Sequence, residues 1–189
     1  GSYNTAFGDD ALQANTTASY ITAVGYQSLT SNTTGQNNTA LGYNSLSLNT
    51  TGQNNTSIGH DSLDVNTTGS SLTAVGQGAL GANTTASNNT AVGYRALAVT
   101  TTAPNNIGLG AYALTTNTTG SENVAVGFGS MNTNSTGMDN TASGVSSLYY
   151  NTTGSQNTAF GRSALLSNTT ANFNTAVGRE AMYANTTGT

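Results

Sequence analysis

The sequence predicts an all-β fold, a parallel β-solenoid (β-roll) of eleven 17-residue coils, on three observations. Glycine recurs every 17 residues without an insertion or deletion. Each unit follows N-T-A-V-G-x-x-(A/S)-L-x-x-N-T-T-(G/A)-x-x, whose Gly, Asn and Thr content disfavours helix. A short alternation before the Gly is typical of a strand. So strict a period makes residues 1–189 one repeat array rather than a set of globular domains.

The unit divides into two expected strands and two turns when its positions are numbered from the first asparagine. We expect one strand at positions 2–4, before the Gly at position 5, and a second at positions 8–12. Position 9 of that second strand is Leu or Met, as in Leu29 and Leu46. The recurrent N-T-T-G is typical of a turn, because Asn and Gly tolerate left-handed backbone angles. The eleven units begin at Asn4, Ile21, Asn38, Asn55, Leu72, Asn89, Asn106, Asn123, Asn140, Asn157 and Asn174.

Stacking such coils in parallel register places like residues about 4.8 Å apart, so that each repeated position becomes a ladder. An asparagine ladder would let each side-chain amide bond to the coils above and below it. Thr100 interrupts the asparagine ladder at position 12 once. The expected structural ladders are glycines (Gly8, Gly25, Gly42, Gly59, Gly76, Gly93), asparagines (Asn15, Asn32, Asn49, Asn66), leucines (Leu29, Leu46) and valines (Val24, Val92).

The small residue at position 3 predicts association between chains. It is Ala in nine units, Ser57 in one and Gly108 in another, although a strand position that faced solvent would accept almost any residue. We interpret this restriction as close contact with another chain. A strand buried on both faces needs more than one thin roll, so we expect a homotrimer around a threefold axis.

The segments "NTALGYNSL" (Asn38 to Leu46) and "NTAVGYRAL" (Asn89 to Leu97) resemble the head repeats of YadA-like trimeric autotransporter adhesins. The full unit with its N-T-T-G turn also resembles repeat arrays of bacterial surface and phage tail-fibre proteins. The resemblance covers the whole chain. It implies a left-handed roll, three chains in one fibre, and a role in attachment or in spacing an adhesive tip from a surface.

Composition limits the possible partners. Three Arg, no Lys and seven acidic residues cannot make a phosphate-binding surface, and the absence of Cys excludes disulfides and zinc thiolates. We therefore expect no nucleic acid partner and no cofactor. No apolar run reaches the roughly 18 residues of a membrane span, so no membrane contact is expected within this sequence. Both ends fall inside a turn without a divergent capping unit, which predicts a window of a longer fibre.

Candidate reactive residues are few, and we predict no catalytic residue and no metal site. His60, Asp61 and Ser62 adjoin, but neighbouring strand residues point to opposite faces and would not converge as a relay. The acids do not recur in consecutive coils as calcium-binding repeats require. A single ion near Asp61 and Asp64 is the alternative.

Three further patterns have surface interpretations. Aromatic residues recur at position 6, as Tyr26, Tyr43, Tyr94 and Phe128, where they would either bind a sugar or protein or fill a groove between chains. The N-T-T triplets match glycosylation acceptors as well as a ladder. Threonines at positions 13 and 14 allow ice binding as an alternative function.

We expect a structural and adhesive fibre module of an extracellular appendage, on a cell surface or virion tail, with an unidentified receptor and no enzymatic activity.

Overall fold

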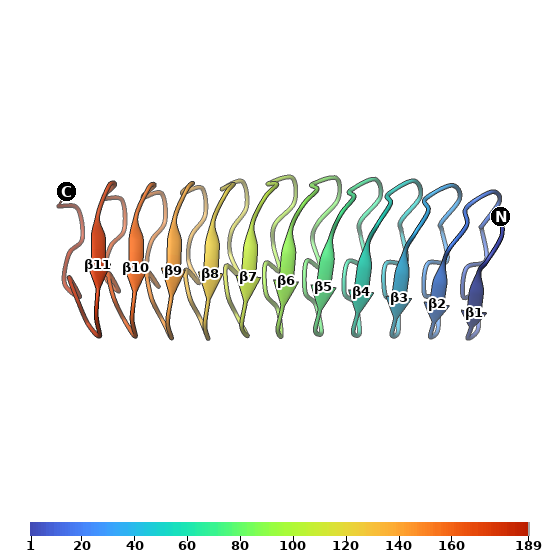
Figure 1. Cartoon of the computed structure of the whole chain (residues 1–189), viewed down its shortest axis with the longest axis horizontal. Coiled ribbons are helices and arrows are strands. Elements are labelled where there is room, and N and C mark those ends of the chain that lie inside the picture. Colours follow the sequence, from blue (N-terminus) through green and yellow to red (C-terminus); the bar gives the residue numbers. More distant parts are fainter. Residues whose placement is uncertain (189) are drawn as a thin grey trace.

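The chain forms a straight stack of coils in a computed structural model, which describes residues 1–188 (Figure 1). Each coil contributes one three-residue strand, and the two termini lie at opposite ends of the stack. The strands within residues 1–188 are β1 (Thr5–Phe7), β2 (Thr22–Val24), β3 (Thr39–Leu41), β4 (Thr56–Ile58), β5 (Thr73–Val75), β6 (Thr90–Val92), β7 (Ile107–Leu109), β8 (Val124–Val126), β9 (Thr141–Ser143), β10 (Thr158–Phe160) and β11 (Thr175–Val177).

The strands make one parallel sheet in which every strand neighbours the next in the sequence. The register is one repeat throughout, so Thr22 pairs with Thr39 and Ala23 with Ala40. Like residues therefore stand above like residues along the whole stack. The predicted parallel β-solenoid of 17-residue coils is confirmed.

The predicted second strand at positions 8–12 is wrong, because these residues form a turn. Positions 7 and 9 adopt left-handed backbone angles in every coil, as at Gln27 (φ 52°) and Leu29 (φ 52°). Such angles cannot continue a strand. The turn still bonds to its neighbours: Leu29 N–H donates to Ser45 O at 3.1 Å and Ser31 N–H to Ser47 O at 3.0 Å. The ladder between coils therefore extends well beyond the strands.

A left-handed leucine is unusual, since that conformation costs about 1–2 kcal/mol for a residue with a Cβ. Here it turns the side chain into the roll, where Leu29 and Leu46 are fully buried. Burying a leucine contributes about 1.5–3 kcal/mol, which offsets the strain. The position 9 leucines thus supply the largest apolar side chains of the core.

The small residue at position 3 also faces this core, which corrects the predicted contact with another chain. Ala23, Ala40 and their equivalents from β2 to β10 are fully buried within the single chain, and only Ala6 in the first coil is exposed. A Cβ added to Gly108 would lie 3.3 Å from Cγ of Leu97, so position 3 faces the leucine ladder. The roll is too thin for a larger residue here. The restriction therefore arises inside one chain, and positions 2 and 4 of each strand face outward.

The predicted glycine ladder at position 5 ends each strand at a place where no side chain fits. Gly25 has φ +126°, and a Cβ added there would lie 2.4 Å from the carbonyl oxygen of Gly42. The same two conditions, positive φ and backbone of the next coil, hold for Gly8, Gly42, Gly59, Gly76 and Gly93. Glycine is therefore required at this position for two reasons, the positive φ and the close approach of the next coil.

The asparagine ladder at position 12 is present inside the roll. Asn66 Nδ2 donates to Asn49 Oδ1 at 2.9 Å, and Asn49 Nδ2 donates to Asn32 Oδ1 at 2.8 Å. All three side chains are fully buried. Asn15, in the first coil, is only half-buried, and its Oδ1 has no partner within residues 1–188. The ladder thus begins at Asn32 rather than at Asn15.

A second asparagine ladder, at position 1, was not predicted. Asn38 Oδ1 accepts the backbone N–H of Asn55 at 2.9 Å, and Asn38 Nδ2 donates to Gly52 O at 2.7 Å. The same pattern recurs at Asn140 and Asn157. Its signal was in the sequence, because position 1 is Asn in nine of eleven units. The ladder at position 1 therefore joins the start of each strand to the N-T-T turn, and the ladder at position 12 joins each N-T-T turn to the next.

Candidate binding surfaces

The outer strand face is made of positions 2 and 4 of β2 to β10, and no part of the chain covers it within residues 1–188. Position 2 is mostly threonine, whereas position 4 forms an apolar row that only Ser143 interrupts. Leu41 is 46% exposed, and Val92, Leu109, Val126 and Phe160 are each more than one third exposed. Val24 is half-buried on the same face. The valines predicted as a structural ladder thus form a ladder on the outside of the roll. A long row of exposed apolar side chains of this kind is typical of an interaction face.

Aromatic side chains at position 6 stack along the edge where each strand enters the following turn. Tyr26 stacks on Tyr43 with ring centroids 5.2 Å apart, and Tyr43 stacks on His60 at 5.0 Å. Tyr26 and Tyr43 remain 41% and 47% exposed. These predicted surface residues therefore support one another while keeping their outer faces accessible.

A second aromatic group follows farther along the same edge. Tyr94 contacts Tyr112 edge to face at 5.2 Å, and Tyr112 contacts Phe128 in the same way at 5.8 Å. Tyr112 lies at position 7 rather than 6, so the sequence comparison by position did not group it with Tyr94 and Phe128. Edge-to-face pairs of this kind are favourable beyond their buried area.

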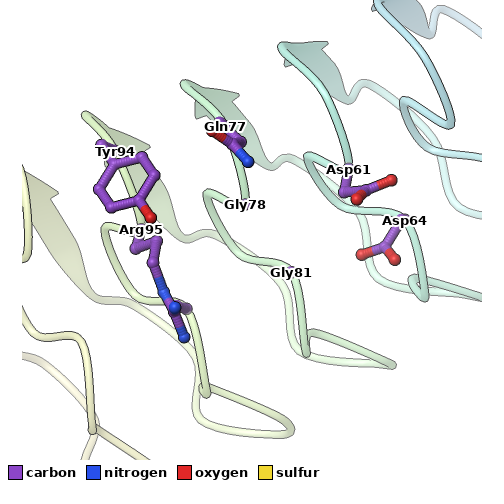
Figure 2. Close-up of a pocket in the computed structure, with 8 residues that line it drawn as sticks. Asp61, Asp64, Gln77, Gly78, Gly81, Tyr94 and Arg95 are labelled. Carbon is purple, nitrogen blue, oxygen red and sulfur yellow. The ribbon is translucent and has the colours of Figure 1, made fainter.

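The charged notch is a hollow between this second aromatic group and the coil of β4 (Figure 2). Its volume is about 240 Å³. Asp61 and Asp64 lie on one side, Tyr94 and Arg95 lie two coils farther along, and Gly78 and Gly81 lie between them. The lining residues are Asp61, Asp64, Gln77, Gly78, Gly81, Tyr94, Arg95 and Ala98.

Asp64 is the carboxylate of the notch with a shifted pKa. Partial burial raises the pKa of Asp64 above its ordinary value of 3.8, and the neighbouring charge of Asp61 raises it further. Asp61 itself lies 3.0 Å from Nδ1 of His60. The two side chains therefore meet, contrary to the prediction that neighbours here point apart, because they lie in a turn. Ser62 does not join them, since it is fully buried and bonds to Ser57 inside the roll.

The aromatic notch is a second hollow, of about 360 Å³, between the coils of β7 and β9. Tyr112, Phe128 and Tyr149 supply its aromatic walls, and Thr115 and Asn132 supply polar groups. A Cβ added to Gly129 would lie 3.2 Å from the ring of Tyr149, so this ring lies over the glycine.

Both notches arise from the same sequence feature, a glycine at position 7. This position carries a side chain in nine units and is glycine at Gly78 and Gly129. Each missing side chain opens a gap in the row along the edge. Neither gap was predicted, because the glycines at position 7 depart from the repeat and were not distinguished from the glycine that recurs at position 5.

The two notches present mainly polar and aromatic side chains. Residues 1–188 contain no group of three or more His, Cys, Asp or Glu side chains placed to hold a metal ion. They also contain no helix long and apolar enough to cross a membrane.

The N-T-T asparagines Asn32, Asn49 and Asn66 are buried and hydrogen-bonded, so they are inaccessible to glycosylation in the folded chain. Exposed Asn37, Asn54 and Asn88 remain accessible acceptor sites.

No protein-family model matches the chain, and neither the curated proteins nor the solved structures that were compared with it give a match. Its fold class is therefore established by its own geometry.

Proposed function

We propose that the chain is a rigid fibre module of an extracellular appendage, a surface adhesin or a tail fibre, and that it works as a homotrimer. The exposed apolar row on the outer strand face is the observation that carries this proposal. A module of this kind supplies height and stiffness for attachment, and its receptor is a protein or glycan.

The apolar row supports association because the core of each roll is already filled by the chain's own leucines and alanines. The outer residues Leu41, Val92 and Val126 therefore have no role in the single-chain core. Burying an apolar row against its own copies around one axis removes it from water and makes a closed assembly. Three is the number of chains that the resemblance to adhesin head repeats implies.

Stiffness follows from bonds that run along the stack. Each coil joins the next through the strand ladder, through the turn ladder and through two rows of buried asparagine amides. Residues held in this way on all sides open rarely, which protects the backbone against proteases. A stalk or spacer needs these properties and needs no reactive residue.

The test compares two exposed leucines of one coil by sedimentation. Leu41 lies on the outer strand face and Leu48 lies on the turn, and their exposed fractions are 46% and 47%. The wild-type chain is expected to sediment at three times the 19.0 kDa mass of one chain. Leu41→Asn should shift the assembly toward monomer with unchanged circular dichroism, whereas Leu48→Asn should not. A wild-type chain that stays at 19.0 kDa at micromolar concentration would refute the trimer.

Ice binding is the second candidate function, and one observation favours it. Thr22, Thr39, Thr56, Thr73 and Thr90 form an outward row on consecutive strands, spaced by one coil. The row ends at Ile107, and the threonines of positions 13 and 14 lie in turns rather than on the sheet. Ice-growth inhibition by the wild-type chain that Thr56→Val and Thr73→Val weaken would favour this function over the fibre.

A further inference from the structure

We propose that the charged notch binds a small zwitterion of the amino-acid type. Its ammonium group would lie at Asp61 and Asp64, and its carboxylate at Arg95. Binding of this kind goes beyond the fibre function and does not depend on how many chains associate.

The charged notch contains more charged residues than the low charge of the whole chain predicts. The chain has three Arg and seven acidic residues among 189. Two of those acids and one of those arginines are among the eight residues that line the notch. They are also sorted by sign, because Figure 2 shows the two carboxylates on one wall and Arg95 two coils away. Two coil spacings amount to about 10 Å along the stack. The notch therefore carries a dipole across its width.

The charges that face the notch are incompletely neutralised by the protein. Within residues 1–188, the close contacts between a basic group and a carboxylate join His60 to Asp61 and Arg179 to Glu180, so Arg95 has no carboxylate partner. Within the same residues Asp64 has no cation at ion-pair distance either. Burial and the charge of Asp61 raise the pKa of Asp64, and the nearby His60 opposes this shift only in part. A ligand ammonium group would relieve the repulsion between the two carboxylates, and a ligand carboxylate would pair with the fork of Arg95.

The gap between the walls has room for such a molecule. Gly78 and Gly81 contribute no side chains, and the cavity of about 240 Å³ is open to solvent. Gln77 and Tyr94 also line it, so an amide and a phenol ring can contact the part of the ligand between its two charged groups. In small-molecule sites, a few precisely placed polar groups fix the orientation of the ligand.

Opposite charges on the two walls select against the simpler ligands. A bare cation at Asp61 and Asp64 would be repelled by Arg95, and a bare anion at Arg95 would be repelled by the carboxylates. A neutral molecule would displace water from the carboxylates and from Arg95 without providing an opposite charge to either. A zwitterion satisfies both walls at once, and this complementarity is the basis of the assignment.

The test is a titration of the isotope-labelled chain followed by the backbone amide signals of Gly78 and Gly81. Glycine and β-alanine are the zwitterionic probes, and ethylamine and acetate each carry one of the two charges. We expect saturable shifts at both glycines with a zwitterion at millimolar concentration, and at least about tenfold weaker binding of the single-charge probes. Absence of a saturable shift with either zwitterion, or equal binding of acetate or ethylamine, would overturn the assignment.

Variants separate the proposed site from nonspecific binding. Arg95→Gln and Asp64→Asn should each weaken binding of the better zwitterion at least about tenfold. Exposed Arg162→Gln is the matched control and should leave binding unchanged. Gly78→Asn should block the notch without unfolding the chain, because Asn44 holds the same position with φ 52°. Unchanged binding by Arg95→Gln and Gly78→Asn would refute the site, and sedimentation of the same samples reports separately on the trimer.

Discussion

Asn83 and Thr100 occupy the same place in adjacent coils, and the buried amide ladder is broken between them. Elsewhere along this ladder the amide of one coil donates to the carbonyl of the preceding one, as Asn83 Nδ2 does to Asn66 Oδ1 at 2.9 Å. Thr100 has no amide, and its hydroxyl donates to Asn117 O at 3.0 Å instead. Asn83 Oδ1 is consequently buried without a partner. An unpaired buried acceptor costs about 1–3 kcal/mol.

Thr100→Asn is therefore expected to stabilise the chain by about 1 kcal/mol, because its amide would reach Asn83 Oδ1 and restore the ladder. For a chain of this size such a gain corresponds to an increase in Tm of about 2–4 °C. Thermal unfolding of the two proteins measures it. Thr102→Asn, an exposed change two residues away, should leave Tm unaltered. A lower Tm for Thr100→Asn would mean that the threonine fits its site better than an asparagine.

Gly59→Ala should destabilise the chain by at least about 3 kcal/mol. Its φ is +136°, and the added Cβ would lie 2.7 Å from backbone atoms of Gly76, so strain and overlap act together. Gly78→Ala is the matched control, since its φ of +62° is shared by non-glycine residues and the nearest atom to the added Cβ is 3.7 Å away. Chemical denaturation of the two variants should separate them, and equal losses would show that the close approach at Gly59 is unimportant.

Much of the fold was predictable because 17-residue self-similarity fixes the register before any local propensity is considered. Once coils stack in register, the ladders at Gly25, Asn49 and Leu46 follow from geometry. The strand at positions 2–4 was predictable from its alternation. The second strand was not excluded, because the left-handed angles of Gln27 and Leu29 have no signature in residue type. Leucine in that conformation is a consequence of packing rather than of local preference.

The candidate site was less predictable, since it depends on departures from the repeat. Position 3 was recognised as restricted, but alternation alone does not say which of two faces is inside, and Ala40 proved to be the inner residue. Tyr94 and Phe128 were recognised from their shared position. Tyr112 was not, because its ring reaches them from the neighbouring position. The charged notch needs Asp61, Gly78 and Arg95 together, and only the spacing between coils brings these three to one place.

Ala40→Leu tests the corrected orientation of the strand. Ala40 is fully buried inside the roll, so a larger side chain would overpack the core and cost about 1–3 kcal/mol in the free energy of unfolding. Thr39→Val, its neighbour on the outer face, should be nearly neutral, because Val124 occupies the equivalent position in another coil. Urea unfolding measures the two changes. A tolerated leucine at position 40 together with a destabilising valine at position 39 would reverse the assignment of the faces.

Asp64→Asn should make the stability of the chain less dependent on pH. The pKa of Asp64 is raised in the folded state by burial and by Asp61, so the folded chain binds a proton more tightly than the unfolded chain. The contribution of Asp64 to stability is therefore most favourable below its ordinary pKa of 3.8 and is lost as the pH rises through the folded pKa. Removing the charge should raise stability slightly at neutral pH and leave it unchanged in acid. Exposed Asp139→Asn is the control, and urea unfolding at several pH values measures the difference. A loss of stability at neutral pH in Asp64→Asn would show instead that the carboxylate is stabilised by its surroundings.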